Sequence, residues 1–235
     1  MEIIILRISQ YKEKDGIIEA ISSEENLSFL ARGIFDPKSK IALLNNPLTV
    51  ADIELSEGKY AYKIIKSGTI LLSPIKNNAD LRYMSSLMMI NEAVNYLLSE
   101  EEKPLVFSYL YSAIENIKNS DNPLKVVLPF LLHILKISGY DFEINECISC
   151  GSKKNITTFS FPDGGFICQK CYTNDIPKLF NKEQMLLIRN AFGIQTPYID
   201  FTNISDEEVL FIFDKVVEFI YDSYGHKMKS YELIK

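Results

Sequence analysis

The sequence has little of what most enzymes need. Only two of its 235 residues are histidine, and it contains no GxxxxGK phosphate loop, no GxGxxG after a predicted strand, no HExxH and no GxSxG. Acidic pairs such as Glu24-Glu25 fit solvated surface positions. We therefore expect no catalytic activity, and we interpret His133 as a core residue and His226 as a favourable charge at a helix C-terminus.

Long apolar stretches are also missing. The longest uncharged stretches, such as residues 104–114, fall well short of the ~20 apolar residues that a membrane-spanning helix needs. The run from Ile3 to Leu6 is too short for the core of a signal peptide, and no basic residue precedes it. We expect a cytoplasmic protein without membrane association, in which the four cysteines favour metal or redox chemistry over disulfides.

Basic residues are fewer than acidic ones. The chain has 25 Lys and Arg against 31 Asp and Glu, a net charge of −6, which at first argues against a nucleic-acid-binding protein. The acid is unevenly distributed: residues 1–80 carry 10 basic and 11 acidic groups, residues 81–146 carry 5 and 9, residues 147–182 carry 5 and 2, and residues 183–235 carry 5 and 9. This distribution confines any DNA contact to one face of a minority of the chain.

Short β-branched or alternating runs fill the first third of the chain. Five or six short strands in under eighty residues favour a closed or nearly closed barrel, because an open sheet would leave unpaired edges. We predict an OB-fold barrel over residues 1–78. The expected strands lie near residues 2–8, 16–22, 27–33, 48–55 and 60–73.

From Asp80 the apolar spacing becomes helical, so residues 79–235 are expected to form a helical domain and the fold to be α+β with more than one domain. Asp80 should cap the first helix, and Asn122 the third, which is apolar on nearly all sides and should lie centrally. The S-D-E-E run at Ser205 predicts a capping box. The expected helices are 80–98, 104–118, 122–137, 182–192 and 205–225.

All four cysteines fall in one pattern, Cys147-x-x-Cys150 and, after seventeen residues, Cys168-x-x-Cys171. Two CxxC turns suit a tetrahedral Zn²⁺ held by four thiolates, with no open position for a catalytic water. The intervening Pro-Asp-Gly-Gly turn between apolar residues predicts a two-stranded ribbon. We predict one structural zinc per chain in an inserted zinc ribbon at 147–171. An iron-bearing or vestigial site, or two redox dithiols, are the alternatives.

Basic residues of the predicted barrel cluster by position along the chain, and on a barrel they could line one groove that binds phosphates. Lysines scattered over a mixed surface are the alternative. The predicted DNA-binding residues are Arg7, Lys12, Lys14, Arg32, Lys38, Lys40, Lys63 and Lys66, with Lys59 in the last cluster. The aromatic residues that could stack on bases, although most are expected in the core, are Tyr11, Phe29, Phe35, Tyr60 and Tyr62.

Several segments resemble the bacterial recombination mediator RecO family. LRISQYKEKDGIIEAIS resembles its first hairpin, LSFLARGIFDPKSK its third-strand segment and basic loop, and FLLHILKISGYDFEINECISCG its central helix and first cysteine pair. FSFPDGGFICQKC is similar to its second cysteine pair, and GHKMKSYELI to its C-terminal segment. One departure is that Ile34, Phe35 and Asp36 stand where the family's loop is usually rich in Arg and Lys, which predicts weaker intrinsic DNA affinity.

The resemblance implies an N-terminal OB fold, a helical domain with a zinc-binding insertion, and no catalytic turnover. It implies binding of single- and double-stranded DNA, strand annealing, and action with RecR at the nucleoid to displace single-strand binding protein so that RecA can load. It also implies docking of the acidic, apolar C-terminal tail of single-strand binding protein, for which Lys227 and Lys229 are candidates.

We therefore predict a DNA-binding mediator of recombinational DNA repair. A zinc-stabilised protein-interaction adaptor without DNA binding is the first alternative, supported by the acidic total and the Ile34–Asp36 departure. A nuclease or other hydrolase is the second, and it would require a metal or base constellation that the sequence does not offer.

Overall fold

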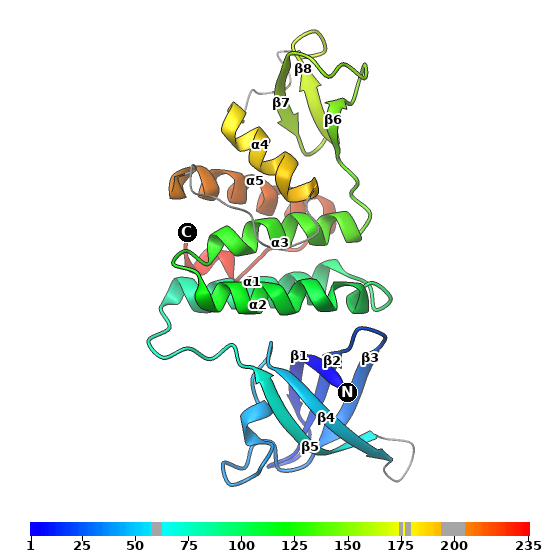
Figure 1. The fold of residues 1–235 in the computed structure, drawn as a ribbon, viewed down its shortest axis with the longest axis vertical. Coiled ribbons are helices and arrows are strands. Elements are labelled where there is room, and N and C mark those ends of the chain that lie inside the picture. The colour runs from blue at the N-terminus through cyan, green and yellow to red at the C-terminus, as the bar shows by residue number, and fades with distance from the viewer. Residues whose placement is uncertain (58–62, 174–175, 177–179, 194–204) are drawn as a thin grey trace.

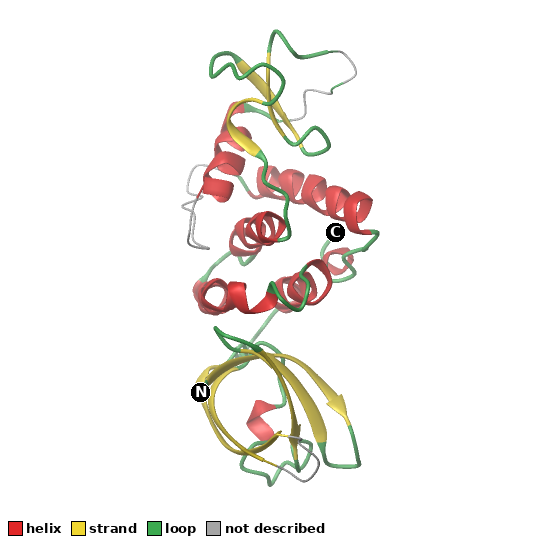
Figure 2. Cartoon of the chain, turned by 90° about the vertical axis from the view of Figure 1, so that its right-hand side faces the viewer, coloured by secondary structure: helices red, strands yellow, loops and turns green. Residues whose placement is uncertain are grey.

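The computed structural model describes residues 1–57, 63–173, 176, 180–193 and 205–235. A closed barrel lies at one end of the elongated chain, a group of helices in the middle, and a small sheet at the other end (Figures 1 and 2). None of the helices in the described ranges is long and apolar enough to cross a membrane.

The barrel has five strands in the order β1-β2-β3-β5-β4, closed by pairing of β1 with β4. Antiparallel ladders join all neighbours except β3 and β5, which run parallel with Leu30 opposite Ile64. This is the strand order of an OB fold, so the predicted fold of the first domain is confirmed. The strands are β1 (Glu2–Gln10), β2 (Gly16–Ile21), β3 (Asn26–Ala31), β4 (Val50–Glu57) and β5 (Lys63–Leu72).

The continuous apolar run at the start of β1 is buried on both faces. Because successive side chains of a strand point to opposite sides, Ile3 and Ile5 enter the barrel core, whereas Ile4 and Leu6 join the core of the helical domain. Ile4 and Leu6 thus extend the core of the helical domain into the barrel. The barrel residues that pack on the helices are Ile4, Leu6, Ile21, Leu48 and Val50.

Polar contacts also join the two domains. The predicted boundary between residues 78 and 79 lies in the connection between β5 and α1 (Leu81–Leu97). Lys76 Nζ donates to the carbonyl oxygen of Lys118 at 3.2 Å, and Lys118 Nζ donates to that of Ser73 at 3.2 Å. Asn26 Nδ2 donates to the carbonyl oxygen of Glu100. The barrel is therefore fixed to the helices by contacts at several points.

The helical domain is built around α3 (Leu124–Ile137), which contacts α1, α2 (Phe107–Asn119), α4 (Lys182–Gly193) and α5 (Asp206–Tyr224). Its central position agrees with its apolar surface. The predicted second helix begins three residues late, because Lys103–Val106 forms a 3-10 turn, η3, that contains Pro104. Two other 3-10 turns are η1 (Ala42–Leu44) and η4 (Tyr231–Leu233).

Side-chain hydrogen bonds cap the starts of α1 and α5. Asp80 accepts a hydrogen bond from Tyr83 N at 2.7 Å, and Ser205 and Glu208 form the predicted capping box of α5. At α3 the prediction is wrong by one residue, because Pro123 takes the N-cap position and has no capping side chain. Asn122, just before it, still accepts from Leu124 N through Oδ1 at 3.2 Å. Local hydrogen bonding therefore marks all three helix starts.

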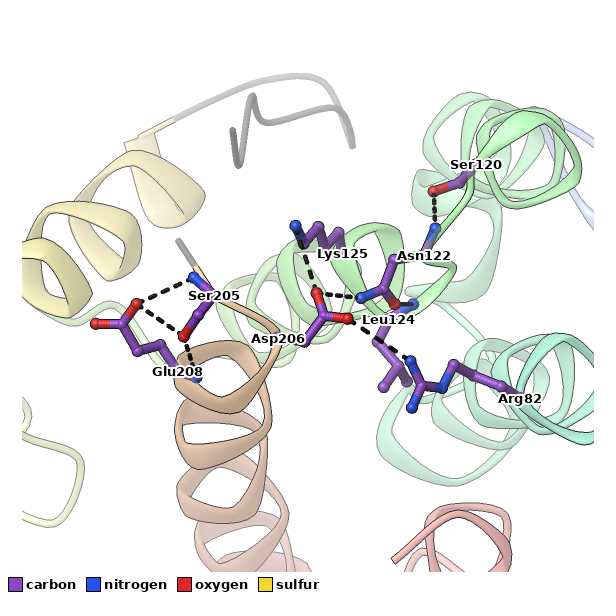
Figure 3. A network of polar contacts seen from close by, with 8 residues as sticks. All are labelled: Arg82, Ser120, Asn122, Leu124, Lys125, Ser205, Asp206 and Glu208. Carbon is purple, nitrogen blue, oxygen red and sulfur yellow. Dashed lines mark hydrogen bonds and ion pairs between the residues drawn. The ribbon is translucent and has the colours of Figure 1, made fainter. Parts of the chain in front are cut away.

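Asp206 ties the first turn of α5 to two other helices (Figure 3). Asn122 Nδ2 donates to its Oδ1 at 2.7 Å, and Lys125 Nζ lies 3.5 Å from the same oxygen. Arg82 of α1 lies 3.8 Å from Oδ2. The positive N-terminal end of the α5 dipole also stabilises the negative charge of this side chain.

The sheet that carries the cysteines has three strands, β6 (Glu143–Cys147), β7 (Ile156–Ser160) and β8 (Gly165–Cys168), in the order β6-β8-β7. The predicted two-stranded ribbon is present as β7 and β8, but β6 adds a third strand that the sequence prediction missed. Gly165 explains the close approach, since a Cβ there would lie 2.6 Å from the Glu143 carbonyl oxygen.

Candidate metal centre and nucleic-acid interface

The four cysteines meet at one end of the three-stranded sheet. Cys147 and Cys168 end β6 and β8, and Cys150 and Cys171 lie in the turns that follow. All four Sγ atoms lie within 4.8 Å of one another, with Cys150 and Cys168 Sγ 3.6 Å apart. A tetrahedral ion with metal–sulfur bonds of ~2.3 Å needs sulfur atoms ~3.8 Å apart, so this donor set fits a metal ion.

Backbone hydrogen bonds prepare the cluster for a cation. Gly151 N donates to the Cys147 carbonyl at 2.8 Å, and Cys171 N to that of Cys168 at 3.0 Å, which closes each CxxC turn. Burial opposes ionisation of Cys147, but N–H groups of Cys168, Ser149 and Cys150 outweigh it and lower its pKa to about 6. Amides aimed at sulfur stabilise thiolate, the form that binds metal.

The last thiol shows why the cluster needs a positive ion. Its hydrogen bond to Cys150, together with burial and the neighbouring Cys147, raises the pKa of Cys171 to about 12. Four thiolates therefore do not coexist without a cation between them.

Two basic loops of the barrel adjoin one another; we call residues 11–15 and 32–40 the paired loops. Gly33 N donates to Asp15 Oδ1 at 2.8 Å, and Phe35 N to the Lys14 carbonyl at 3.1 Å. Lys14 Nζ lies 2.9 Å from Asp36 Oδ2. The predicted DNA-binding residues that the structure brings to the paired loops are Lys12, Lys14, Arg32, Lys38 and Lys40, all of them exposed.

The other three predicted DNA-binding residues lie elsewhere. Arg7 is on β1 beside α1, Lys63 lies 3.7 Å from Glu25, and Lys66 is exposed on β5. Lys59, Tyr60 and Tyr62 are outside the described residues. The paired loops thus hold the largest group of predicted DNA-binding residues.

The departure at Ile34–Asp36 has a structural explanation. Ile34 is only 1% exposed because it fills the barrel core, and Phe35 packs against that core. The hydrogen bond and charge of Lys14 hold the pKa of Asp36 below its usual value. The segment therefore anchors the loop and neutralises one lysine, which leaves less charge for phosphates.

A cavity of about 710 Å³ lies where β1, α1 and the C-terminal segment meet. It contains both Arg7 and Lys229, together with apolar Met88 and Leu233. Lys227 lies in a different groove along α5, with its Nζ 3.3 Å from Glu232. The two predicted partner-binding lysines are therefore not brought to one pocket.

Glu92 of α1 holds the C-terminal segment in place. This role of Glu92 was not predicted from the sequence. Its carboxylate accepts from His226 Nε2 at 2.9 Å, from Lys229 N at 3.0 Å, from Ser230 N at 3.1 Å and from Ser230 Oγ. Burial would raise the pKa of Glu92, but these hydrogen bonds outweigh it and lower the pKa. One signal was available: Glu92 is the sole acidic residue of α1.

The two histidines have partners in the helical domain. His133 stacks on Tyr109 with ring centroids 3.7 Å apart, and burial, aided by Lys136, lowers its pKa to about 4. His226 follows the left-handed Gly225 cap and stacks on Tyr96 at 4.3 Å. Its contact with Glu92 gives it a defined role in holding the C-terminal segment.

Comparison with known proteins agrees with this architecture. The model of the family described as "Recombination protein O C terminal" matches residues 78–232, more than half of the chain. "DNA repair protein RecO" of Bacillus subtilis (strain 168) is 23% identical over 97% of this chain and 90% of its own length. The protein of the same name from Clostridium perfringens (strain 13 / Type A) is 25% identical over 99% and 95%. The chain therefore belongs to the RecO family.

Proposed function

We propose that this protein is a non-enzymatic DNA-binding mediator of recombinational DNA repair. The observation that carries the proposal is the meeting of two basic loops on an OB-type barrel, in a chain whose relatives are named DNA repair proteins. The loops would track the phosphates of single- and double-stranded DNA and so support strand annealing. The helical domain would contact RecR and single-strand binding protein at the nucleoid and so help RecA to load.

Charge reversal tests the DNA face. The double variant Arg32→Glu/Lys40→Glu should weaken binding of a fluorescent single strand at least tenfold, because both side chains are exposed on the paired loops. Lys153→Glu/Lys154→Glu is the matched control: it makes the same charge change on exposed lysines at the opposite end of the molecule (Figure 1). Equal losses in the two double variants would place the DNA face elsewhere.

We propose that the four thiolates of Cys147, Cys150, Cys168 and Cys171 hold one structural Zn²⁺. When bound, the ion would offset two of the four thiolate charges and fix the sheet to its turns, without an open position for catalysis. Metal analysis of freshly purified protein should give one zinc per chain, and Cys150→Ser should lower that content and loosen residues 147–171. Iron, or no metal at all, would refute this assignment.

We propose that Lys229 docks the acidic tail of single-strand binding protein; Lys227, which lies in a different groove, is not part of this proposed site. Arg7, Lys103 and Lys229 line the cavity of the proposed site beside apolar Met88 and Leu233, the chemistry that an acidic, apolar peptide requires. Three carboxylates that oppose such a peptide, Glu19, Glu92 and Glu100, line it as well. Lys229→Glu should weaken binding of a tail peptide, with Lys154→Glu unchanged. An unchanged affinity would exclude this cavity.

An adaptor without DNA binding is the second candidate. The contact between Lys14 and Asp36, and the burial of Ile34, favour it because they reduce the charge offered to phosphates. It predicts no binding of single strands at micromolar protein even at low salt.

A further inference from the structure

One aromatic ring stands exposed on the paired loops. Tyr11 is 54% exposed, whereas Phe29 is 1% exposed and Phe35 packs against the barrel core. Among the described aromatic residues that could stack on bases, the structure therefore leaves Tyr11 available. Single exposed rings are common on protein surfaces. What distinguishes Tyr11 is its place on the paired loops beside Lys12 and Lys14.

The turn that carries Tyr11 is held in place before any ligand arrives. Tyr11 N and Lys12 N both donate to the Asp15 carbonyl oxygen, at 2.9 and 3.3 Å. Asp15 in turn accepts from Gly33 N across the paired loops at 2.8 Å. A ring on a fixed turn loses little conformational freedom on binding, which favours affinity.

One cation lies over the ring. Lys12 Nζ lies 5.3 Å from the centroid of the Tyr11 ring, within the range of a cation–π contact. This lysine lies over one face of the ring, and the 54% exposure of Tyr11 leaves ring surface for a planar ligand. Because Asp36 already pairs with Lys14, the paired loops offer modest charge, and a stacking contact would supply affinity that charge does not.

We propose that Tyr11 stacks on an unpaired nucleobase and makes the paired loops prefer single-stranded over double-stranded DNA. This inference rests on the proposed DNA-binding function. Stacking on an aromatic side chain needs a base with an accessible face, and the bases of a duplex already stack on one another. Phosphate contacts from the lysines, by contrast, are open to both forms of DNA.

The test compares binding of a fluorescent 20-nucleotide oligothymidine and a duplex of equal length. Tyr11→Ala should weaken binding of the single strand about tenfold, equivalent to about 1.4 kcal/mol, and leave duplex binding within about twofold. Tyr11→Phe keeps the ring and should bind like the unaltered protein. The slope of affinity against salt should not change, because no charge is removed.

Tyr221→Ala is the matched control, since Tyr221 is 56% exposed on α5, away from the barrel. This variant should bind both DNA forms with the affinity of the unaltered protein. An unaltered single-strand affinity in Tyr11→Ala, or an equal loss for both DNA forms, would overturn the inference and leave the DNA-binding proposal standing. Failure of the unaltered protein to bind either form would instead overturn both. If Tyr11→Ala weakens only binding of RecR, Tyr11 is a protein contact and the stacking role is wrong.

Discussion

Removal of the Glu92 carboxylate should detach the C-terminal segment from α1. The carboxylate is 12% exposed and accepts four hydrogen bonds from residues 226–230. Hydrogen bonds to a charged group contribute roughly 1.5–3 kcal/mol each, but their contributions are not additive, and donors that detach regain water. The net loss is also limited to the free energy that docks this one segment.

We therefore expect Glu92→Ala to lower the free energy of unfolding by about 3 kcal/mol. For a chain of this size that corresponds to a melting temperature about 6–12 °C lower. Glu92→Gln should lose less, about 2 kcal/mol of the free energy of unfolding. Its one remaining oxygen would still accept a hydrogen bond, but its amide NH₂ would face the N–H groups of Lys229 or Ser230.

Urea unfolding measures the stability, and hydrogen exchange of the Lys229 and Ser230 amides locates the loss. Both amides should exchange faster in Glu92→Ala, because their acceptor is gone. Glu115→Ala, an exposed glutamate on α2, is the control and should change stability by under about 0.5 kcal/mol. If Glu92→Ala behaves like this control in both measurements, Glu92 does not hold the C-terminal segment.

Two further predictions concern the helical core and the cysteine sheet. The pKa of His133 is about 4 in the folded protein against about 6.5 in the unfolded chain, so unfolding takes up a proton and stability should fall as pH drops from about 6.5 to about 4. His133→Phe should flatten that decline in urea titrations, and an unchanged slope would contradict the assignment. Gly165→Ala places a Cβ 2.6 Å from the Glu143 carbonyl, so it should separate β6 from β8 and cost about 1–3 kcal/mol; unchanged thermal unfolding and metal content would count against it.

The features that could be predicted from the sequence are those with local causes. The barrel followed from short apolar runs, and the helix starts from single polar caps such as Asp80 and Ser205, which bond to backbone within three residues. The cysteine cluster followed from spacing alone, because two CxxC turns can bring four sulfur atoms together whatever the intervening loop does.

The features that it missed depend on contacts between distant segments. β6 has a short, largely polar sequence that resembles a loop, and it becomes a strand because Gly165 lets β8 approach. Glu92 looked like an ordinary helical glutamate until the C-terminal segment met it. The pairing of Lys14 with Asp36 likewise required two loops to be placed side by side.

The most direct test of DNA binding by the paired loops is the salt dependence of single-strand affinity. With the paired loops offering a small number of cations, affinity for a labelled oligonucleotide should fall with salt at a slope of about −0.7 per neutralised phosphate, and the protein should accelerate annealing of complementary strands. Absence of both binding and annealing at micromolar protein and low salt would contradict a DNA-binding function. It would favour the protein-interaction adaptor without DNA binding.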